Sequence, residues 1–248
     1  DMNSQSCERI PLLNDTIIIG KIGSNMDYIW LATSNTLYRF DKLGREWINY
    51  KLPETNKVIM GIFSNDDEVF CSTDGAVYKF TISTEKWNTY THQYTFSSEA
   101  AFFKTSSDFF IAGGKTILKY HSASVSWSKS EFDSRLCDLI NEDSILFCAT
   151  ASNIYKLSLG TGIIQPIDIP GIKEVKTLSK NGDTLFIAEK NRIFKYNLKN
   201  SSLETIEYPQ NVDVLNLLKI TTYDEFIIAI YNSMVASYDK SNRIWSQA

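Results

Sequence analysis

The segment Val77-Tyr78-Lys79-Phe80, followed by Trp87 seven residues after Phe80, decides the fold of this chain. It reads apolar, aromatic, basic, aromatic, and similar segments recur along the whole sequence. The other five are Leu37–Phe40, Ile117–Tyr120, Ile154–Leu157, Ile193–Tyr196 and the weaker Val235–Tyr238. The second positions of the six segments are separated by 40, 40, 37, 39 and 42 residues. A period this regular indicates a repeat architecture with six units.

Two further strands are predicted upstream of each segment. A short run of β-branched and aromatic residues that ends in small residues comes first, as is typical of a central strand packed on both faces. These runs are Tyr28–Thr33, Glu68–Thr73, Phe109–Gly114, Ser144–Ala149, Thr184–Glu189 and Glu225–Ile230. Apolar residues before them predict an innermost strand, for example at Thr16–Gly20, Val58–Ile62, Ala100–Phe103 and Val214–Leu218.

A bulky apolar residue seven positions after each basic-aromatic segment predicts the outer strand. These residues are Trp47, Trp87, Trp127, Ile164, Leu203 and Trp245, so four of the five tryptophans occupy one repeat position. A large ring there would bury much area between neighbouring units. We therefore expect a structural role for these tryptophans.

Six units of four strands, without helical periodicity, predict an all-β chain that is either a propeller or an open solenoid. Radial closure protects the sheet edges, which favours a six-bladed β-propeller with four antiparallel strands per blade. We expect one domain over residues 1–248, as propellers of this size are often undivided. Glu8–Leu13 resembles the end of an outer strand and Arg243–Trp245 its beginning. The two termini are therefore predicted to meet in the last blade and close the ring.

Gly113-Gly114, then Tyr120, then Trp127 seven residues later resembles the kelch repeat. Only this unit has the double glycine, and the units are shorter than typical kelch repeats. Ile29–Thr33 followed by Leu37–Asp41 is equally similar to the propeller repeats of bacterial sensor kinase ectodomains. Both resemblances imply a propeller fold and leave the function open.

Composition narrows the range of partners. The formal net charge is −4 and the basic residues are scattered, so neither nucleic acid nor an anionic membrane surface is a predicted partner. No apolar run approaches the roughly 20 residues that a membrane span needs. The cytoplasm is the predicted compartment; secretion or the periplasm is the alternative, in which Asn14 and Asn200 would be glycan acceptors.

Four cysteines are too few for a disulfide scaffold. Cys71 and Cys148 are predicted to be buried free thiols. Because Cys137 and Cys148 lie about opposite each other across a predicted hairpin, a disulfide between them is the alternative in an oxidising compartment.

The sequence predicts no catalytic residue, no metal ligand and no cofactor. It has only two histidines, His92 and His121, and it lacks a nucleophile-elbow sequence and a phosphate-binding glycine loop. An aspartate precedes the second strand of every unit: Asp27, Asp67, Asp108, Asp143, Asp183 and Asp224. These carboxylates could bind cations, but turn chemistry is favoured because each lies in a separate unit.

The candidate binding surface is made of the turns between second and third strands and the links between units. Its candidate residues are Tyr90, His92, Tyr94, Lys115, Arg135, Lys190, Arg192 and Tyr231. The link from Asn88 to Ser98 is the longest, and long loops on rigid scaffolds often carry binding residues. We therefore predict a non-catalytic binding module or scaffold for a protein or peptide. A lectin or small-molecule sensor is the alternative, with carbohydrate as one ligand class, and a hydrolase or lyase is the third possibility.

Overall fold

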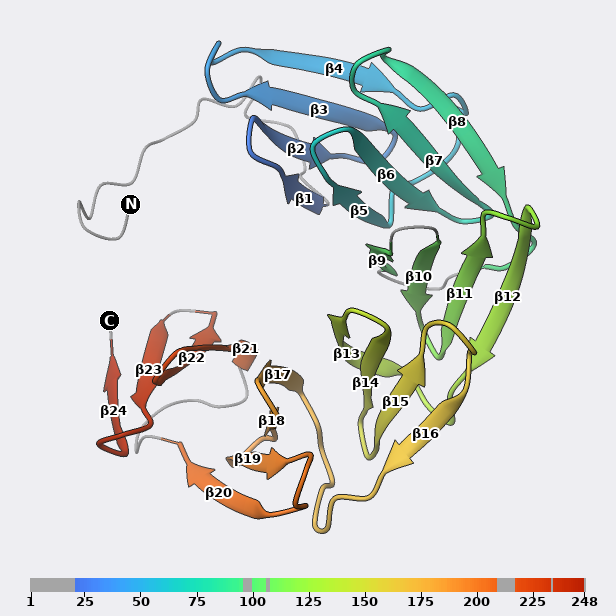
Figure 1. Cartoon of the computed structure of the whole chain (residues 1–248). Helices are drawn as coiled ribbons and strands as arrows, with labels where there is room; N and C mark the ends of the chain where they lie inside the picture. The colour runs from blue at the N-terminus through green and yellow to red at the C-terminus, as the bar shows by residue number, and fades with distance from the viewer. Residues whose placement is uncertain (1–20, 96–99, 106–107, 209–216, 233, 248) are drawn as a thin grey trace. The chain divides into compact units, whose positions relative to one another are not determined.

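The computed structural model describes residues 21–95, 100–105, 108–208, 217–232 and 234–247. Within these residues the chain forms six sheets, each of four antiparallel strands, and no helix. The predicted all-β class and the four-stranded units are thus confirmed (Figure 1). No helix in the described part is long and apolar enough to cross a membrane.

The chain divides into two compact units, Asp1–Phe102 and Phe103–Ala248. In each sheet, which we call a blade, the strands run in chain order from inner to outer. Unit 1 holds blade 1, with β1 (Lys21–Ser24), β2 (Tyr28–Ala32), β3 (Thr36–Asp41) and β4 (Trp47–Lys51), and blade 2, with β5 (Gly61–Ser64), β6 (Glu68–Thr73), β7 (Ala76–Thr81) and β8 (Lys86–Thr91). Unit 2 holds blades 3 and 4, formed by β9 (Ala100–Lys104, which begins in unit 1), β10 (Phe109–Gly113), β11 (Thr116–His121), β12 (Ser126–Glu131), β13 (Leu136–Glu142), β14 (Ile145–Thr150), β15 (Ile154–Ser158) and β16 (Ile164–Ile167). It also holds blades 5 and 6, formed by β17 (Thr177–Asn181), β18 (Thr184–Ala188), β19 (Arg192–Asn197), β20 (Leu203–Glu207), β21 (Leu217–Tyr223), β22 (Phe226–Tyr231), β23 (Val235–Asp239) and β24 (Ile244–Gln247).

The seven-residue offset of the tryptophans is a property of the hairpin between the third and fourth strands. Each tryptophan lies directly opposite the last aromatic residue of the preceding strand, with ring centroids about 5 Å apart, as in Phe80 and Trp87 at 4.9 Å. The turn contains one residue in the left-handed region, with φ between 52° and 75°. These residues are Arg45, Glu85, Val125, Gly162, Ser201 and Arg243.

The tryptophans pack first on their own blade, and Trp245 also contacts the neighbouring blade. Its Nε1 donates to the backbone carbonyl of Glu207 at 2.8 Å, and its ring lies 6.1 Å from that of Tyr208. The expected packing between blades therefore holds at this position.

The predicted start of the innermost strand is confirmed in blade 3, where β9 begins at Ala100, and is wrong in blade 2. β5 begins at Gly61 rather than Val58. The predicted Thr16–Gly20, and residues 214–216 of the predicted Val214–Leu218, lie outside the described residues. In blade 2 the apolar run therefore covers the end of the preceding link as well as the start of the strand.

The aspartates before the second strands are turn residues. Asp143 and Asp224 adopt left-handed φ values of 49° and 40°. The backbone carbonyls of Asp27, Asp67 and Asp183 accept N–H groups from the next hairpin of the same blade. Turn geometry explains the repeat of this residue, and the described residues contain no cluster of three or more potential metal ligands.

The alternative of a disulfide between Cys137 and Cys148 is wrong for this structure. Cys137 lies at a β-bulge between Leu136 and Asp138, and Leu139, not Cys137, is the register partner of Cys148. Both thiols are free, as is that of Cys71. The bulge, which the sequence did not reveal, moves Cys137 out of register.

The predicted closing of the ring by residues 8–13 lies outside the described residues. Blade 6 takes all four of its described strands from Leu217–Gln247. A single domain over residues 1–248 likewise stays a prediction, because the two units are each described by themselves.

Candidate functional site on the loop surface of unit 2

The hairpin between β18 and β19 carries two predicted binding residues, Lys190 and Arg192. The Arg192 guanidinium lies 4.4 Å from the centroid of the Phe194 ring, and its Nε is 3.4 Å from a carboxylate oxygen of Glu189. Lys190 is exposed and forms no ion pair within the described residues. The hairpin thus holds one cation against the blade and presents the other to solvent.

Glu189 is a buried carboxylate, with only 6% of the residue exposed. It accepts the backbone N–H groups of Lys173 at 2.6 Å and Glu174 at 3.3 Å, both in the link between blades 4 and 5. The Tyr208 hydroxyl donates to the Glu189 backbone carbonyl at 3.0 Å. Because an unpaired buried carboxylate would be very unfavourable, these bonds fix the link against the hairpin.

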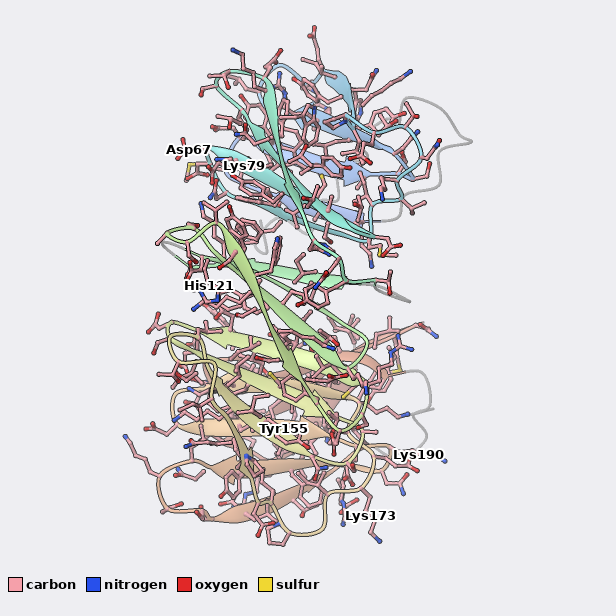
Figure 2. The ribbon with its side chains drawn as sticks, turned by 90° about the vertical axis from the view of Figure 1, so that its right-hand side faces the viewer. Asp67, Lys79, His121, Tyr155, Lys173 and Lys190 are labelled. Carbon is pink, nitrogen blue, oxygen red and sulfur yellow. The ribbon has the colours of Figure 1, made fainter. Side chains whose placement is uncertain are left out.

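A polar groove of about 500 Å³ lies where this link and hairpin meet. Its lining combines three cations with three carboxylates and one amide: Lys173, Lys190, Arg192, Glu174, Glu189, Glu207 and Asn191. Figure 2 shows Lys173 and Lys190 on one side of unit 2 and His121 on the other. Ammonium groups at the edge of an open polar groove can bind carboxylate or amide oxygens of a ligand.

The predicted residues Lys115 and Arg135 lie near each other at the junction of blades 3 and 4. The backbone carbonyl of Gly114 accepts the N–H of Leu136 at 2.8 Å, which places the Lys115 turn beside Arg135. Lys115 pairs with Glu131 at 3.0 Å. Arg135 is exposed and, in the part of the chain described, has no ion pair.

Three exposed cations of unit 2, Arg135, Lys173 and Lys190, are therefore without an ion pair among the described residues, and we call them the loop cations.

The predicted residues Tyr90, His92 and Tyr94 belong to unit 1. Tyr90 lies within β8, opposite Val77, and not in the link as predicted. The His92 N–H donates to the backbone carbonyl of Gly75 at 2.8 Å, and the His92 Nδ1 accepts the Tyr94 N–H at 3.3 Å. Burial lowers the pKa of His92, so the neutral ring is favoured. The rings of His92 and Tyr94 lie together, with centroids 6.2 Å apart, whereas Tyr90 interacts with Lys79 on the neighbouring strand.

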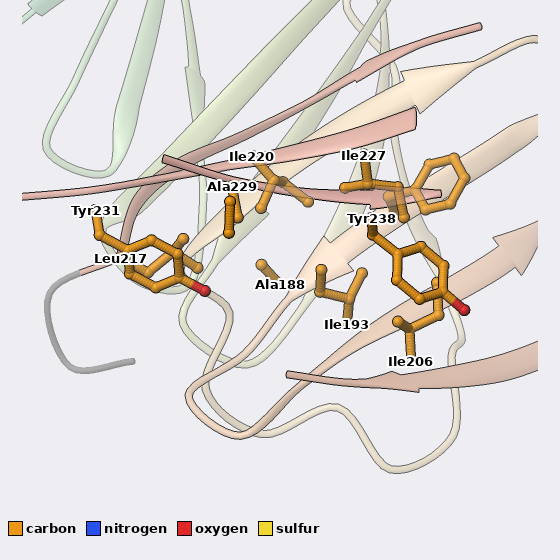
Figure 3. Close-up of a cluster of buried hydrophobic side chains, with 11 residues drawn as sticks. Ala188, Ile193, Ile206, Leu217, Ile220, Ile227, Ala229, Tyr231 and Tyr238 are labelled. Atoms are coloured by element: carbon orange, nitrogen blue, oxygen red, sulfur yellow. The ribbon is translucent and has the colours of Figure 1, made fainter. Parts of the chain in front are cut away.

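Tyr231 is not on the loop surface. Only 4% of it is exposed, and its ring packs with Leu217, Ile220 and Ala229 in the core of blades 5 and 6 (Figure 3). Burial raises the pKa of its hydroxyl to about 12. β22 extends through Tyr231, so a residue predicted to lie in the turn points into the core instead.

Sequence reasoning missed Lys173 and Glu189. At the repeat position of Glu189, three other blades have Thr33, Thr73 and Thr150, whose hydroxyls donate within their own hairpins. The replacement of threonine by glutamate at this one position was the available signal. Nothing in the repeat pattern marked Lys173.

No family model matches the chain. A search of curated proteins also finds no match. Solved structures do match, and the computationally designed Ika8 protein has a TM-score of 0.73 at 11% identity, covering 93% of this chain and 74% of that one. The extracellular domain of BT4673 from B. thetaiotaomicron has a TM-score of 0.70 at 12% identity, covering 98% of this chain and 34% of that one. The Pan2 WD40 domain of Neurospora crassa has a TM-score of 0.68 at 14% identity, covering 93% of this chain and 78% of that one.

Similarity at such low identity shows the fold alone. Because no family model matches, the narrower resemblance to kelch repeats stays a prediction. Together with the six four-stranded sheets, the likeness to the WD40 and BT4673 domains identifies a six-bladed β-propeller.

Proposed function

We propose that the chain is a non-catalytic binding module that engages a protein or peptide through the loop surface of unit 2. The observation that carries this proposal is the groove beside Glu189, where a buried carboxylate fixes the loops that present Lys173 and Lys190. Loops that are already ordered lose little conformational freedom on binding, which favours affinity. Binding residues are also commonly found on loops that a rigid scaffold positions.

The charges indicate the chemistry of the partner. The loop cations have no ion pair among the described residues, whereas Lys115 and Arg192 are already paired with glutamates. A partner segment with acidic side chains opposite Arg135, Lys173 and Lys190 would gain charge complementarity and faster association. We therefore propose an acidic protein segment as the partner.

A multivalent lectin, the first alternative, would place the same polar residues between successive blades. The equivalent positions differ between blade pairs, for example Glu85 in blade 2 and Arg243 in blade 6. This difference counts against repeated sugar sites. A hydrolase or lyase remains the third possibility, and we assign no residue to it.

The cytoplasm remains the predicted compartment. The likeness to an extracellular domain supports the secreted or periplasmic alternative. Mass spectrometry of the native protein would decide for secretion if it found a glycan on the exposed Asn200.

The proposed function is tested by reversing two loop cations in the variant K173E/K190E. Both side chains are exposed, so thermal unfolding should be unchanged. The tagged protein is used to purify partners from its native organism, and the captured partner is then titrated by calorimetry. At roughly 1 kcal/mol per reversed charge, we expect binding to weaken about 30-fold at low salt, and the difference between variant and wild type to shrink as salt screens the charges.

The control K199E/R243E makes the same charge change in the β19–β20 and β23–β24 hairpins and should bind like the wild type. Equal affinity of K173E/K190E and the wild type would contradict the proposed surface.

A further inference from the structure

A second groove, of about 480 Å³, lies on the outer rim between blades 5 and 6 of unit 2. Its apolar wall is formed by Phe186, Ile206, Tyr238 and Trp245, and its basic rim by Lys195, Lys240 and Arg243. Figure 3 shows Ile206 and Tyr238 together at one end of the core cluster. Thr205 and the carboxylates of Glu204 and Glu207 also line it, so three cations and two carboxylates surround the aromatic surface.

The equivalent place between blades 1 and 2 is filled by a side chain of the protein itself. Tyr50 holds the strand position of Ile206, since Tyr50 pairs with Leu37 as Ile206 pairs with Ile193. Its ring lies 4.5 Å from that of Phe80, the counterpart of Tyr238. With isoleucine in place of tyrosine, the volume of a phenol ring is left open between blades 5 and 6.

The residue beside the Tyr50 hydroxyl between blades 1 and 2 is negatively charged, whereas the equivalent residue between blades 5 and 6 is positively charged. Between blades 1 and 2, the Tyr50 hydroxyl donates to a carboxylate oxygen of Glu85 at 2.8 Å. Arg243 holds the position of Glu85, since both residues have left-handed φ values in the same hairpin turn. A carboxylate that accepts a hydrogen bond is therefore replaced by a guanidinium that can only donate one, so the group that Arg243 faces must be an acceptor.

Lys240 is a second cation in this groove, and it also favours a ligand group that accepts hydrogen bonds. Lys240 stands where blade 2 has Ile82 and blade 5 has Leu198, which both pack against apolar clusters. Its Nζ lies 5.5 Å from the centroid of the Phe186 ring and donates to the backbone carbonyl of Asp224. Among the described residues neither Lys240 nor Arg243 forms an ion pair, whereas Lys195 pairs with Glu204 at 3.1 Å.

We propose that this groove binds a small aromatic anion, a single planar ring carrying a phosphate, sulfate or carboxylate group. The ring takes the place that Tyr50 fills between blades 1 and 2, against Ile206 and Tyr238. The anionic group faces Lys240 and Arg243. The volume lies within the range of small-molecule sites. The groove shares only Glu207 with the lining of the groove on the loop surface, and none of the loop cations lines it.

The test titrates the wild-type protein with phenyl phosphate and, separately, with inorganic phosphate, followed by NMR and calorimetry. A ligand of this size should bind with a dissociation constant of about 0.1–1 mM, and inorganic phosphate at least about tenfold more weakly because it lacks the ring. Ile206→Tyr, which fills the groove, and Arg243→Glu, which reverses its charge, should each abolish binding. Lys199→Glu makes the same charge change outside the groove and should leave binding unchanged.

A stability measurement makes the test independent of the choice of ligand. The double variant I206Y/R243E recreates the arrangement of Tyr50 and Glu85, so its melting temperature should exceed the sum of the two single effects by about 2–4 °C. The proposal is overturned if phenyl phosphate does not bind at 10 mM (about tenfold above the expected range), if phosphate alone binds equally well, or if Ile206→Tyr and Arg243→Glu bind like the wild type. Additive effects in the double variant would overturn the equivalence of the two places.

Discussion

Asp138 should contribute more to stability than any other side chain of the inner strands in unit 2. Its carboxylate accepts the Thr177 hydroxyl at 2.6 Å, the Leu178 N–H at 2.7 Å and the Leu139 N–H at 2.8 Å. It also pairs with Lys219 Nζ at 2.5 Å. One carboxylate on β13 therefore connects the inner strands of three successive blades.

The structure allows the size of the effect to be worked out. Only 15% of the Asp138 side chain is exposed, and hydrogen bonds to charged groups contribute about 1.5–3 kcal/mol each. Asp138→Ala leaves the Leu178 N–H without this acceptor, so we expect a loss of about 3–4 kcal/mol in the free energy of unfolding, which corresponds to roughly 10 °C. Lys219 is 43% exposed, so Lys219→Met should cost no more than about 1 kcal/mol.

Urea unfolding of the two variants and the wild type measures these differences. Asp138→Asn keeps one acceptor oxygen and should fall between the other two variants. Equal losses in Asp138→Ala and Lys219→Met would refute the reasoning, because the ion pair and not the backbone bonds would then dominate. A loss below about 1 kcal/mol in Asp138→Ala would refute it as well, since the bonds would then contribute no more than an exposed ion pair.

Three other predictions concern a turn residue, a histidine and two cysteines. Val125 is 75% exposed and has a φ of 52°, which is unfavourable for a β-branched residue. Val125→Gly should therefore raise the free energy of unfolding, measured in denaturant melts, by about 0.5–1 kcal/mol, and a loss of stability would show that the turn is not strained. Burial holds the pKa of His92 below its value in the unfolded chain, so the unfolded state binds more protons. The free energy of unfolding should therefore fall as the pH drops through about 6.5. The fall should be smaller in His92→Asn, and parallel pH profiles of the variant and the wild type would contradict this. Burial raises the pKa of the Cys71 thiol to about 12 and also raises that of Cys148. Iodoacetamide at pH 8 should therefore modify neither thiol in the folded protein and both thiols in guanidinium. Peptide mapping that found either cysteine modified before unfolding would contradict their burial.

The fold could be predicted because its determinants are periodic. Trp47, Trp87, Trp127 and Trp245 keep one offset, since each lies opposite the last aromatic of the preceding strand in a hairpin of constant geometry. The β-bulge at Cys137 could not be predicted, because a single inserted residue changes the register without changing the pattern of residue types.

The candidate site was predicted only in part, and the errors have physical causes. Lys190 and Arg192 were found because a hairpin turn exposes its residues, but their different surroundings depend on Glu189, whose partners lie 15 and 16 residues away in the chain. Tyr231 was misplaced because the strand continues one residue beyond the apparent turn. Long-range contacts and strand ends are not encoded in local patterns.

Because the six blades share one backbone pattern, residues at equivalent positions can be compared, and a residue that differs from its counterparts is a candidate for a functional role. Where all blades need the same turn or wedge, equivalent positions hold similar residues, as with the aspartates of the inner hairpins. Glu189 in place of threonine, and Ile206 and Arg243 in place of Tyr50 and Glu85, are changes that the shared backbone does not require. Each replaces an interaction that another blade satisfies within the protein: the threonine hydroxyl with its own hairpin, and the Tyr50 phenol with Glu85. Glu189 finds new partners in the link, whereas no side chain in the described part fills the place of the Tyr50 ring between blades 5 and 6. A blade that loses the packing of a half-buried ring must gain elsewhere or be less stable, and a ligand that replaces the ring is the compensation that the proposed titration measures.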